Sequence, residues 1–344
     1  MISTVIPVFN EAESLEKLHA ELAAVAEAEG YKLDMVFVDD GSTDGSWDVI
    51  ERLAEADERV HGIRFRRNFG KAAALSAGFD AVQGDLVMTL DADLQDDPKE
   101  IPRFLAKLSE GLDVVSGWKQ VRHDPWHKVW PSRVFNGMVS RMTGVQLHDH
   151  NCGMKCYRRE VLSEVRLYGE MHRFVPVLAA ARGFRVGEIP IEHRAREFGQ
   201  SKYGVKRFIK GFLDLLTVVF LTGFGQRPQH LLGSLGLLFF GVGGFLMTWL
   251  AGHWAMSRII TEMEVIHLHQ SPMLAYSLAL LLLGAQMLSM GFLAELITAK
   301  TSREADIYSV KQRTDGAPDD QPDHEDLARR RRKTDRDKSL SSEA

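Results

Sequence analysis

Two long segments without a charged side chain constrain this chain more than any other feature of its sequence. Neither the segment from Leu231 to Gly252 nor the one from Ser271 to Ala294 contains Asp, Glu, Lys or Arg. Since an α-helix rises 1.5 Å per residue, each segment would measure at least about 30 Å as a helix, the thickness of the hydrocarbon core of a bilayer. We therefore expect two membrane-spanning helices. The alternative is a pair of helices buried in a soluble core.

The basic residues around these segments predict their orientation. In the loop between them, His253 to Gln270, Arg258 is the only Lys or Arg, whereas Lys300 and Arg303 follow the second segment. Further basic residues precede the first segment: Lys202, Lys206, Arg207, Lys210 and Arg227. The positive-inside rule places both flanks in the cytoplasm and the loop outside. We expect two spans in the cytoplasmic (inner) membrane, with the N-terminal part and both termini in the cytoplasm.

The first hundred residues alternate between apolar strands and helical patterns. Strands are expected at Ser3–Val8, Asp34–Val38, Val60–Phe65 and Asp85–Leu90, and helices up to about Glu29, over Ser46–Ala56 and over Lys71–Val82. This alternation predicts an α/β fold with a mostly parallel sheet and helices on both faces. Polar residues follow every strand: Asn10 and Glu11, Asp39 and Asp40, Arg67 and Asn68, Asp91 and Asp93. Because open α/β sheets bind ligands outside the carboxyl ends of their strands, these residues predict a site there.

Asp91 and Asp93 flank a single alanine directly after the fourth strand. Two carboxylates this close repel each other unless a cation lies between them. Ions of the Mg²⁺ type take a few carboxylate oxygens and leave room for substrate phosphates, so the pair predicts a divalent-cation site. Taken alone, such a pair has a simpler alternative, which is a solvated turn.

Composition and short motifs exclude several classes of function. The chain has 42 Lys and Arg against 47 Asp and Glu, a net charge of -5, so no basic excess points to nucleic acid. The G-x-G-x-x-G and Walker fingerprints are absent, which argues against dinucleotide binding and ordinary ATP hydrolysis. No signal peptide is expected, because the chain opens directly into an apolar strand. Two cysteines are too few for a disulfide framework, and a zinc site of these with two nearby histidines would be cramped: His148, His150, Cys152 and Cys156.

A basic cluster lies just before the membrane segments. Arg196, Gly199, Ser201 and Lys202 suit a phosphate, because Arg offers a planar fork, Lys a point charge and Gly a close approach of the backbone. An amphipathic helix begins at Val205, so a phosphate bound by this cluster would lie at the bilayer surface. Two more candidates for phosphate binding are Lys119 and Arg133.

Five motifs, taken together in this order, resemble those of the family-two inverting glycosyltransferases. They are Ile6-Pro7-Val8-Phe9-Asn10-Glu11, Val38-Asp39-Asp40-Gly41-Ser42-Thr43-Asp44, Arg67-Asn68-Phe69-Gly70-Lys71, Asp91-Ala92-Asp93-Leu94-Gln95 and Arg196-Glu197-Phe198-Gly199-Gln200-Ser201-Lys202. The resemblance is to the polyprenyl-phosphate hexosyltransferase group, which includes dolichyl-phosphate mannose synthase and bactoprenol glucosyltransferase. It implies a GT-A fold, a UDP- or GDP-linked sugar donor, Mg²⁺ or Mn²⁺, an undecaprenyl or dolichyl phosphate acceptor, and a homo-oligomer.

The resemblance also implies roles for particular residues. The metal and the diphosphate would be held by Asp91, Asp93 and Gln95. The donor nucleotide would be held by Pro7, Glu11, Asp39, Asp40, Arg67 and Lys71. The acceptor phosphate would be held by Lys119, which stands where many relatives have Arg, and by Arg133, Arg196, Ser201 and Lys202. Asp149 precedes a stretch similar to one near the sugar, as a candidate base or orienting group. The catalytic set would then be Asp93, Asp149, Arg133, Arg196 and Lys202.

These features divide the chain into a cytoplasmic GT-A domain (1–204), a juxtamembrane amphipathic helix (205–228), a two-helix anchor (229–300) and a polar, disordered cytoplasmic tail (301–344). The motifs and spans leave two alternative functions. A processive polysaccharide synthase would need more spans and a Gln-x-x-Arg-Trp motif, and the sequence contains neither. A non-catalytic membrane protein that only binds nucleotide sugars would be expected to lose acids such as Asp93.

Overall fold

The computed structural model describes residues 1–120, 126–165, 171–192, 194, 205–224, 227–260 and 271–301. Three residues of the predicted acceptor site therefore lie outside the described part of the chain: Arg196, Ser201 and Lys202. Residues 302–344 of the predicted disordered tail lie outside it as well, whereas Thr301 is the last residue of the helix α10 (Pro272–Thr301).

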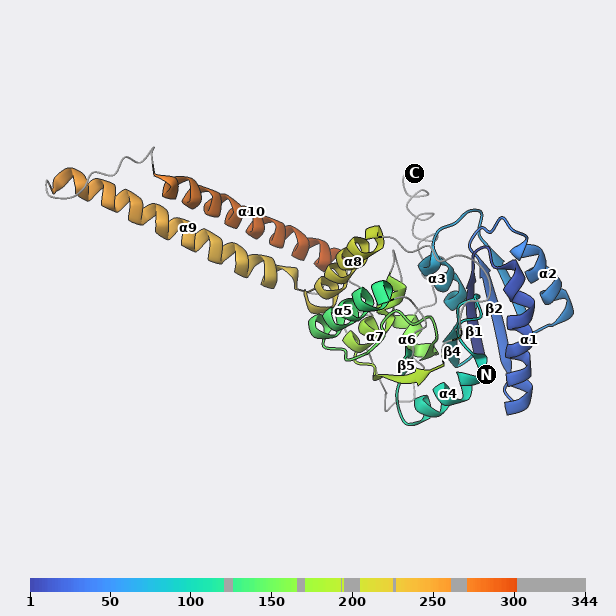
Figure 1. Cartoon of the computed structure of the whole chain (residues 1–344). Coiled ribbons are helices and arrows are strands. Elements are labelled where there is room, and N and C mark those ends of the chain that lie inside the picture. The colour runs from blue at the N-terminus through green and yellow to red at the C-terminus, as the bar shows by residue number, and fades with distance from the viewer. Residues whose placement is uncertain are drawn as a thin grey trace, which may run out of the picture. The chain divides into compact units, whose positions relative to one another are not determined.

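A seven-stranded sheet with the strand order β3-β2-β1-β4-β6-β5-β7 forms the centre of the N-terminal part (Figure 1). All its neighbouring strands are parallel except β6, which runs antiparallel to β4 and β5. This confirms the predicted α/β fold with a mostly parallel sheet. The strands are β1 (Ile2–Val8), β2 (Leu33–Asp39), β3 (Val60–Arg64), β4 (Leu86–Thr89), β5 (Val114–Lys119), β6 (Lys155–Arg158) and β7 (Val186–Ile191).

Helices cover both faces of the sheet because alternate strand residues point to opposite sides. On one face, β1 and β2 pack against α1, whose Leu15, Leu18 and Leu22 recur at helical spacing and are fully buried. Each such leucine contributes about 1.5–3 kcal/mol of burial free energy. On the other face, Val5 packs against α3. The first face carries α1 (Ala12–Glu29), α2 (Ser46–Ala56), η1 (Pro98–Glu100) and α4 (Ile101–Ser109), and the second carries α3 (Lys71–Ala81), α6 (Arg159–Glu164) and α7 (Val175–Ala181).

Two strands and one helix boundary differ from the sequence-based expectation. The sequence predicts a short strand at Glu188–Ile191, which lies within β7, but it indicates none at β5 or β6, which pair with each other and bring the segment after Asp149 into the sheet. The sequence favours a helix around Pro131 to Thr143, but α5 spans Trp126–Thr143, so Pro131 lies inside it rather than at its start.

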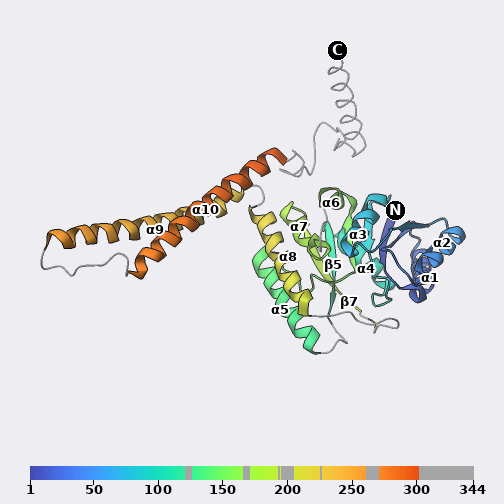
Figure 2. The same ribbon diagram turned by 90° about the horizontal axis from the view of Figure 1, so that it is seen from above.

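The C-terminal helices begin with α8 (Val205–Phe224), as predicted. Its Leu215 and Val218 pack with Phe135 of α5 and with the short helix η2 (Met171–Phe174). The remaining two helices, α9 (Pro228–Ile259) and α10 (Pro272–Thr301), pack against each other: they run side by side in Figure 1 and cross in the view of Figure 2.

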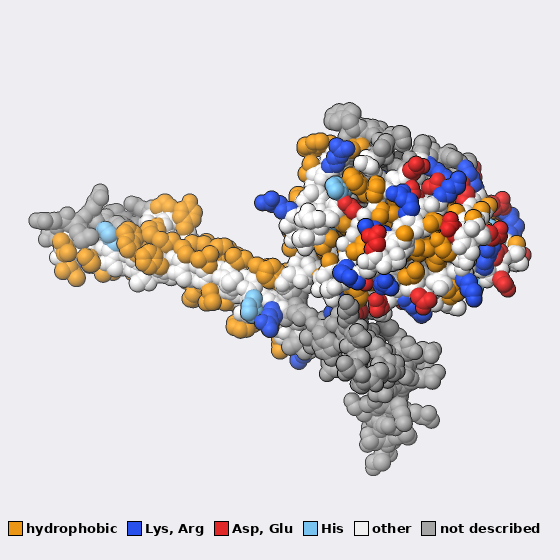
Figure 3. Space-filling model, turned by 90° about the horizontal axis from the view of Figure 1, so that it is seen from below, with side chains coloured by type: hydrophobic (Ala, Val, Ile, Leu, Met, Phe, Trp, Pro, Cys, Tyr) orange, Lys and Arg blue, Asp and Glu red, His pale blue; other side chains and the backbone are white. Residues whose placement is uncertain are grey.

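Both α9 and α10 are long and apolar enough to cross a membrane. Only 17% of the most apolar window of each is buried, which does not fit the alternative of two helices within a soluble core. Figure 3 shows hydrophobic side chains along the surface of this hairpin. The two helices approach closely at small residues: a Cβ on Gly284 would lie 2.5 Å from the backbone N of Phe240 and 2.7 Å from the carbonyl O of Gly236.

Candidate active site

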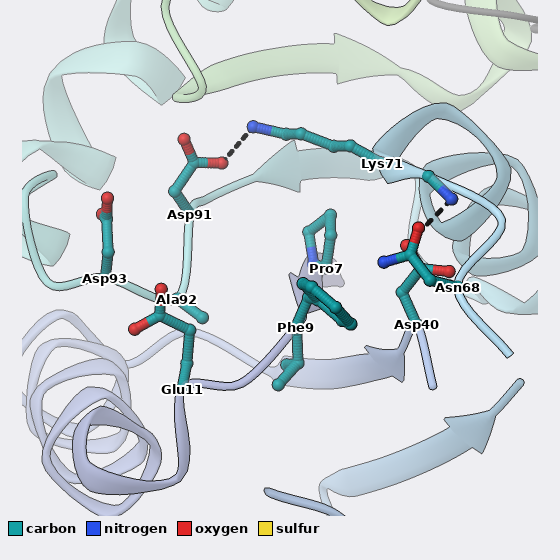
Figure 4. A pocket seen from close by; sticks show the side chains of 11 residues that line it. Pro7, Phe9, Glu11, Asp40, Asn68, Lys71, Asp91, Ala92 and Asp93 are labelled. Atoms are coloured by element: carbon teal, nitrogen blue, oxygen red, sulfur yellow. Dashed lines mark hydrogen bonds and ion pairs between the residues drawn. The ribbon is translucent and has the colours of Figure 1, made fainter. Parts of the chain in front are cut away.

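A pocket of about 280 Å³ opens at the carboxyl ends of β1, β2 and β4. The strand order reverses between β1 and β4, because β2 and β3 lie on one side of β1 and β4 lies on the other. Open α/β sheets bind their ligands at such a point. Figure 4 shows acidic side chains around an apolar floor. The pocket is lined by Pro7, Val8, Phe9, Glu11, Asp40, Asn68, Gly70, Lys71, Asp91, Ala92 and Asp93.

Asp40 shapes one wall of the pocket by holding the loop after β3. Its carboxylate accepts hydrogen bonds from the backbone N–H groups of Phe69 (2.6 Å) and Gly70 (2.9 Å). Burial raises the pKa of Asp40, and the neighbouring charge of Asp39 adds to this, while the two backbone hydrogen bonds oppose it. The loops after β2 and β3 touch at Gly41, where a Cβ would lie 2.5 Å from the backbone of Arg67.

Asp39 has a different position from its neighbour. Its side chain is fully buried, accepts a hydrogen bond from the backbone N–H of Ser42 (2.9 Å) and lies 3.7 Å from Nε of Arg64. Asp39 is therefore not among the residues that line the pocket, although the sequence predicted both acids as nucleotide ligands. In the structure it fixes the turn that presents Asp40.

The loop after β1 carries Glu11 toward the acid pair (Figure 4). Asn10 has a positive φ of 58°, which Asn tolerates better than most residues. Its side-chain oxygen accepts a hydrogen bond from the backbone N–H of Thr43 (2.9 Å), and its own N–H donates to Ser42 Oγ (2.9 Å). The backbone N–H of Glu11 donates to Ser46 Oγ (3.0 Å). These bonds tie the loops after β1 and β2 together and thereby position Glu11.

Asp91 forms an ion pair with Lys71 across the pocket (Figure 4). Burial opposes its ionisation, but the ammonium groups of Lys71, Lys119 and Lys155 outweigh burial and lower the pKa of Asp91 to about 2. Asp91 therefore carries a negative charge at every physiological pH.

Asp93 lies on the same loop, and only 7% of it is exposed. Its Oδ1 accepts a hydrogen bond from the backbone N–H of Gln95 (3.2 Å). Between these two residues, Leu94 has a positive φ of 59°, which is costly for a side chain of this kind. A strained turn thus sets the direction of the second carboxylate.

These residues fit a divalent cation that shares its ligands with a substrate. Among the described residues, no three His, Cys, Asp or Glu side chains are grouped to hold a metal on their own. Asp91 and Asp93 nevertheless line one pocket, with Glu11 beside them. Mg²⁺ is commonly bound by one or two carboxylates plus substrate phosphates, and this donor set matches that pattern.

The segment with the two cysteines does not match a zinc site. Burial raises the thiol pKa of both Cys152 and Cys156 to about 12, whereas zinc needs the thiolate. His150 forms a hydrogen bond with Ser140 Oγ (3.0 Å), and His148 pairs with Glu188. This alternative therefore finds no support in the described residues.

Several predicted site residues lie outside the pocket lining. Lys119 forms an ion pair with Asp96 (2.8 Å), and although burial lowers its pKa, this carboxylate outweighs burial and raises it. Arg67 is exposed and stacks over the ring of Phe69 (4.6 Å). Asp149 is buried and accepts a hydrogen bond from the backbone N–H of Asn151 (3.0 Å). The half-buried Gln95 and the exposed Arg133, on α5, also lie outside the lining.

The pocket brings together six residues named from the sequence: Pro7, Glu11, Asp40, Lys71, Asp91 and Asp93. Phe9 and Asn68 line it as well. The sequence placed Asn68 among the polar residues that follow strands, but it predicted no ligand for Asn68 or Phe9. Both stand inside motifs that follow strands, and that position was the available signal. No local pattern marks Asp96, whose partner Lys119 is distant in sequence.

The mostly parallel sheet, with acidic residues at the carboxyl ends of its strands, is the arrangement expected of a GT-A-type glycosyltransferase, and comparisons with known proteins agree. The model of the family described as "Glycosyl transferase family 2" matches residues 3–166. Dodecaprenyl-phosphate galacturonate synthase from Rhizobium johnstonii is 37% identical over 318 residues, which cover 90% of this chain and 92% of that protein. Undecaprenyl-phosphate 4-deoxy-4-formamido-L-arabinose transferase from Edwardsiella ictaluri is 36% identical, with 86% and 88% covered. The chain belongs to glycosyl transferase family 2, as its motifs predicted.

Solved structures share the fold at low sequence identity. Mannosyl-3-phosphoglycerate synthase from Rubrobacter xylanophilus gives a TM-score of 0.51 at 16% identity, over 64% of this chain and 74% of that one. Glucosyl-3-phosphoglycerate synthase from Mycobacterium tuberculosis, in complex with Mn²⁺, UDP and phosphoglyceric acid, also gives 0.51, at 15% identity over 64% and 78%. These likenesses confirm the GT-A fold.

Proposed function

We propose that the protein transfers one hexose from a UDP- or GDP-linked sugar to a polyprenyl phosphate at the membrane, with inversion at the anomeric carbon. One observation carries the proposal: the likeness to the dodecaprenyl-phosphate galacturonate synthase covers 90% of the chain, and so includes the two apolar helices as well as the pocket. A relative with the catalytic domain alone would not imply a lipid acceptor. A second relative, the undecaprenyl-phosphate transferase, supports the same acceptor class.

The donor would lie in the pocket between Asp40 and the acid pair. Pro7, Glu11 and Asp40 would hold the nucleoside, since carboxylates accept hydrogen bonds from base N–H groups and ribose hydroxyls. Asp91 and Asp93, with Gln95 on the same loop, would hold Mg²⁺ or Mn²⁺. Such an ion, when bound, stabilises the charge that develops on the leaving diphosphate. Lys71 would also bind the diphosphate, because its ammonium already lies beside Asp91.

The acceptor phosphate needs positioning more than activation. It is already anionic, so it can attack the anomeric carbon without a strong general base, and alignment supplies most of the rate gain. Arg133, Arg196, Ser201 and Lys202 would place it, and Lys119 would act on it only from its ion pair with Asp96. The buried Asp149 would orient the segment near the sugar.

The membrane placement follows from the same proposal. Residues 1–204 would form the cytoplasmic catalytic domain and residues 205–228 an interfacial helix. Residues 229–300 would cross the inner membrane twice, so that the tail, 301–344, returns to the cytoplasm. This arrangement would present the lipid phosphate to the pocket at the cytoplasmic leaflet, and the hairpin of α9 and α10 offers an apolar surface for homo-oligomer formation.

The test uses the full chain purified in detergent with undecaprenyl phosphate and Mg²⁺ or Mn²⁺. A panel of UDP- and GDP-sugars is supplied one at a time, and the lipid fraction is analysed by mass spectrometry. We expect one donor to give a singly glycosylated lipid phosphate. Asp93→Asn should abolish this product, whereas Asp80→Asn, at an exposed position on α3, should leave it unchanged.

Two results would contradict the proposal. The first is transfer to water-soluble acceptors with no lipid product from any donor. The second is normal turnover by Asp93→Asn at saturating metal, which would refute the role of the acid pair.

A further inference from the structure

Glu192 and Arg194, which follow β7, form hydrogen bonds and an ion pair with the loop that carries Asp91 and Asp93 and with the helix η1 after it. We call residues 91–97 the acid loop. The backbone N–H of Arg194 donates a hydrogen bond to the carbonyl O of Gln95 (3.0 Å). The Nη2 atom of Arg194 lies 2.6 Å from Oδ2 of Asp97 at the end of the same loop. Two residues earlier, the backbone N–H of Glu192 donates to Oε1 of Glu100 (3.2 Å).

Arg194 also reaches a third element. Its Nη1 atom donates to Oε2 of Glu21 on α1 (2.8 Å), so one guanidinium bridges two carboxylates from different parts of the chain. The side chain of Arg194 is 31% exposed, and those of Asp97 and Glu21 are 13% and 26% exposed. Burial opposes its charge, but the two carboxylates outweigh burial and raise the pKa of Arg194, which stays protonated.

The acid loop contains a strained residue, so contacts from other elements are needed to hold its conformation. Leu94 has the costly positive φ described above, and a strained conformation of this kind persists only when its surroundings hold it. Asp97 is bound on both sides, because its Oδ1 accepts a hydrogen bond from the backbone N–H of Lys99 (2.9 Å). The peptide of Gln95 is thus held between Asp93 on one side and Arg194 on the other.

We propose that Arg194 is a positioning residue that couples the metal-binding acid loop to the chain that leads into the acceptor-binding cluster. Arg196 follows only two residues later in the sequence. Arg194 therefore holds the acid loop at two points, through its backbone N–H at Gln95 and through its side chain at Asp97. The inference rests on the proposed function, since it takes Gln95 as a donor-side group and Arg196 as an acceptor-side group.

The chain offers a matched control for a purely structural role. Arg182 donates from Nε to Oε2 of Glu164 (2.9 Å), and these side chains are 19% and 9% exposed. This ion pair is at least as buried as the Arg194 pairs, and neither of its residues lines the pocket. Loss of Arg182 should therefore lower stability without changing ligand binding.

The experiment compares Arg194→Ala, Arg194→Lys, Asp97→Asn, the Arg194→Ala/Asp97→Asn double variant and Arg182→Ala as full chains in detergent. Binding of Mn²⁺ is titrated by electron paramagnetic resonance with UDP and, separately, with GDP, without turnover. The KM for undecaprenyl phosphate is measured at saturating donor. We expect Arg194→Ala to raise both the Mn²⁺ half-saturation and the lipid KM by about three- to tenfold.

The other variants sharpen the result. Arg194→Lys should recover only part of the loss. Lysine keeps the positive charge, but one ammonium cannot reach both carboxylates as the guanidinium fork does. The double variant should be no worse than Arg194→Ala, since both changes break the same pair. Arg182→Ala should change neither constant. A rise in only one constant, or an equal rise in Arg182→Ala, would overturn the coupling. Failure of the wild type to make any lipid product would refute the proposed function, whereas an unchanged Mn²⁺ half-saturation in Arg194→Ala would overturn this inference whatever the lipid assay shows.

Discussion

Substitution of Gly153 tests the position of the acid pair without removing either acid. Gly153 lies in the loop before β6, directly against Asp91. A Cβ at this position would lie 2.5 Å from Oδ2, 2.6 Å from Cγ and 2.8 Å from Oδ1 of Asp91. Ordinary van der Waals contact needs 3.4 Å or more. Gly153→Ala must therefore displace the Asp91 carboxylate, or the loop itself, by about 1 Å.

The size of the expected effect follows from this displacement. A misplacement of about 1 Å in a catalytic arrangement can lower the rate by about 10²-fold. This corresponds to about 2.7 kcal/mol of transition-state stabilisation. The same shift would strain the ion pair between Asp91 and Lys71, whose partners are about one-third exposed. We expect kcat/KM to fall by about 10²-fold and the Mn²⁺ half-saturation to rise.

The assay is the formation of glycosylated lipid, measured as kcat/KM and paired with thermal unfolding in detergent. Gly223→Ala is the control, because no atom lies within 4 Å of a Cβ at this position of α8. An alanine in a helix is favourable by up to about 1 kcal/mol over glycine, so this variant should be neutral or slightly stabilised. Activity of Gly153→Ala within twofold of wild type, in a folded protein, would refute the argument that the carboxylate position matters.

Two further predictions concern stability. Asp57 accepts hydrogen bonds from Arg59 and His19, and these lower its pKa. Its ionised carboxylate therefore stabilises the fold above pH ~4, and this stabilisation is lost as the pH falls. Asp57→Asn should lower the free energy of unfolding by about 1–3 kcal/mol at pH 7. In thermal unfolding, the difference between the variant and the wild type should be smaller at acid pH. A persistent difference at low pH would contradict this. Gly284→Val should separate α9 from α10 and lower the unfolding temperature in detergent, whereas Gly241→Val, with no atom within 4 Å, should not.

The sequence predicted the four strands that are rich in apolar residues and are followed by polar turns. Those strands, β1 to β4, are consecutive parallel neighbours in the sheet. The strand β6 could not be predicted from the sequence, because it is only four residues long and contains Lys155 and Arg158. Its place between β4 and β5 depends on pairing with distant segments, which no local periodicity encodes.

For the site, too, some features could be predicted from the sequence and others could not. Residues at the carboxyl ends of parallel strands meet at one sheet edge by geometry, so Glu11, Asp40 and Asp91 could be brought together from sequence alone. Which partner each side chain takes could not be predicted. Lys119 was expected to face a phosphate, yet it pairs with Asp96, because both side chains are nearly buried and a buried charge needs a counter-charge.

The charges around Asp91 bear on how the site would acquire its cation. Lys71 pairs with Asp91, and Lys119 and Lys155 lie close enough to stabilise its negative charge further. A divalent ion that approached Asp91 without substrate would therefore meet ammonium groups that repel it and a carboxylate that is already compensated. A nucleoside diphosphate changes this balance, because its phosphates attract Lys71 and supply further oxygen ligands. We therefore expect the pocket to bind Mn²⁺ much more tightly with a nucleotide than without one, and equal affinity in the two titrations would show that Lys71 does not compete for Asp91.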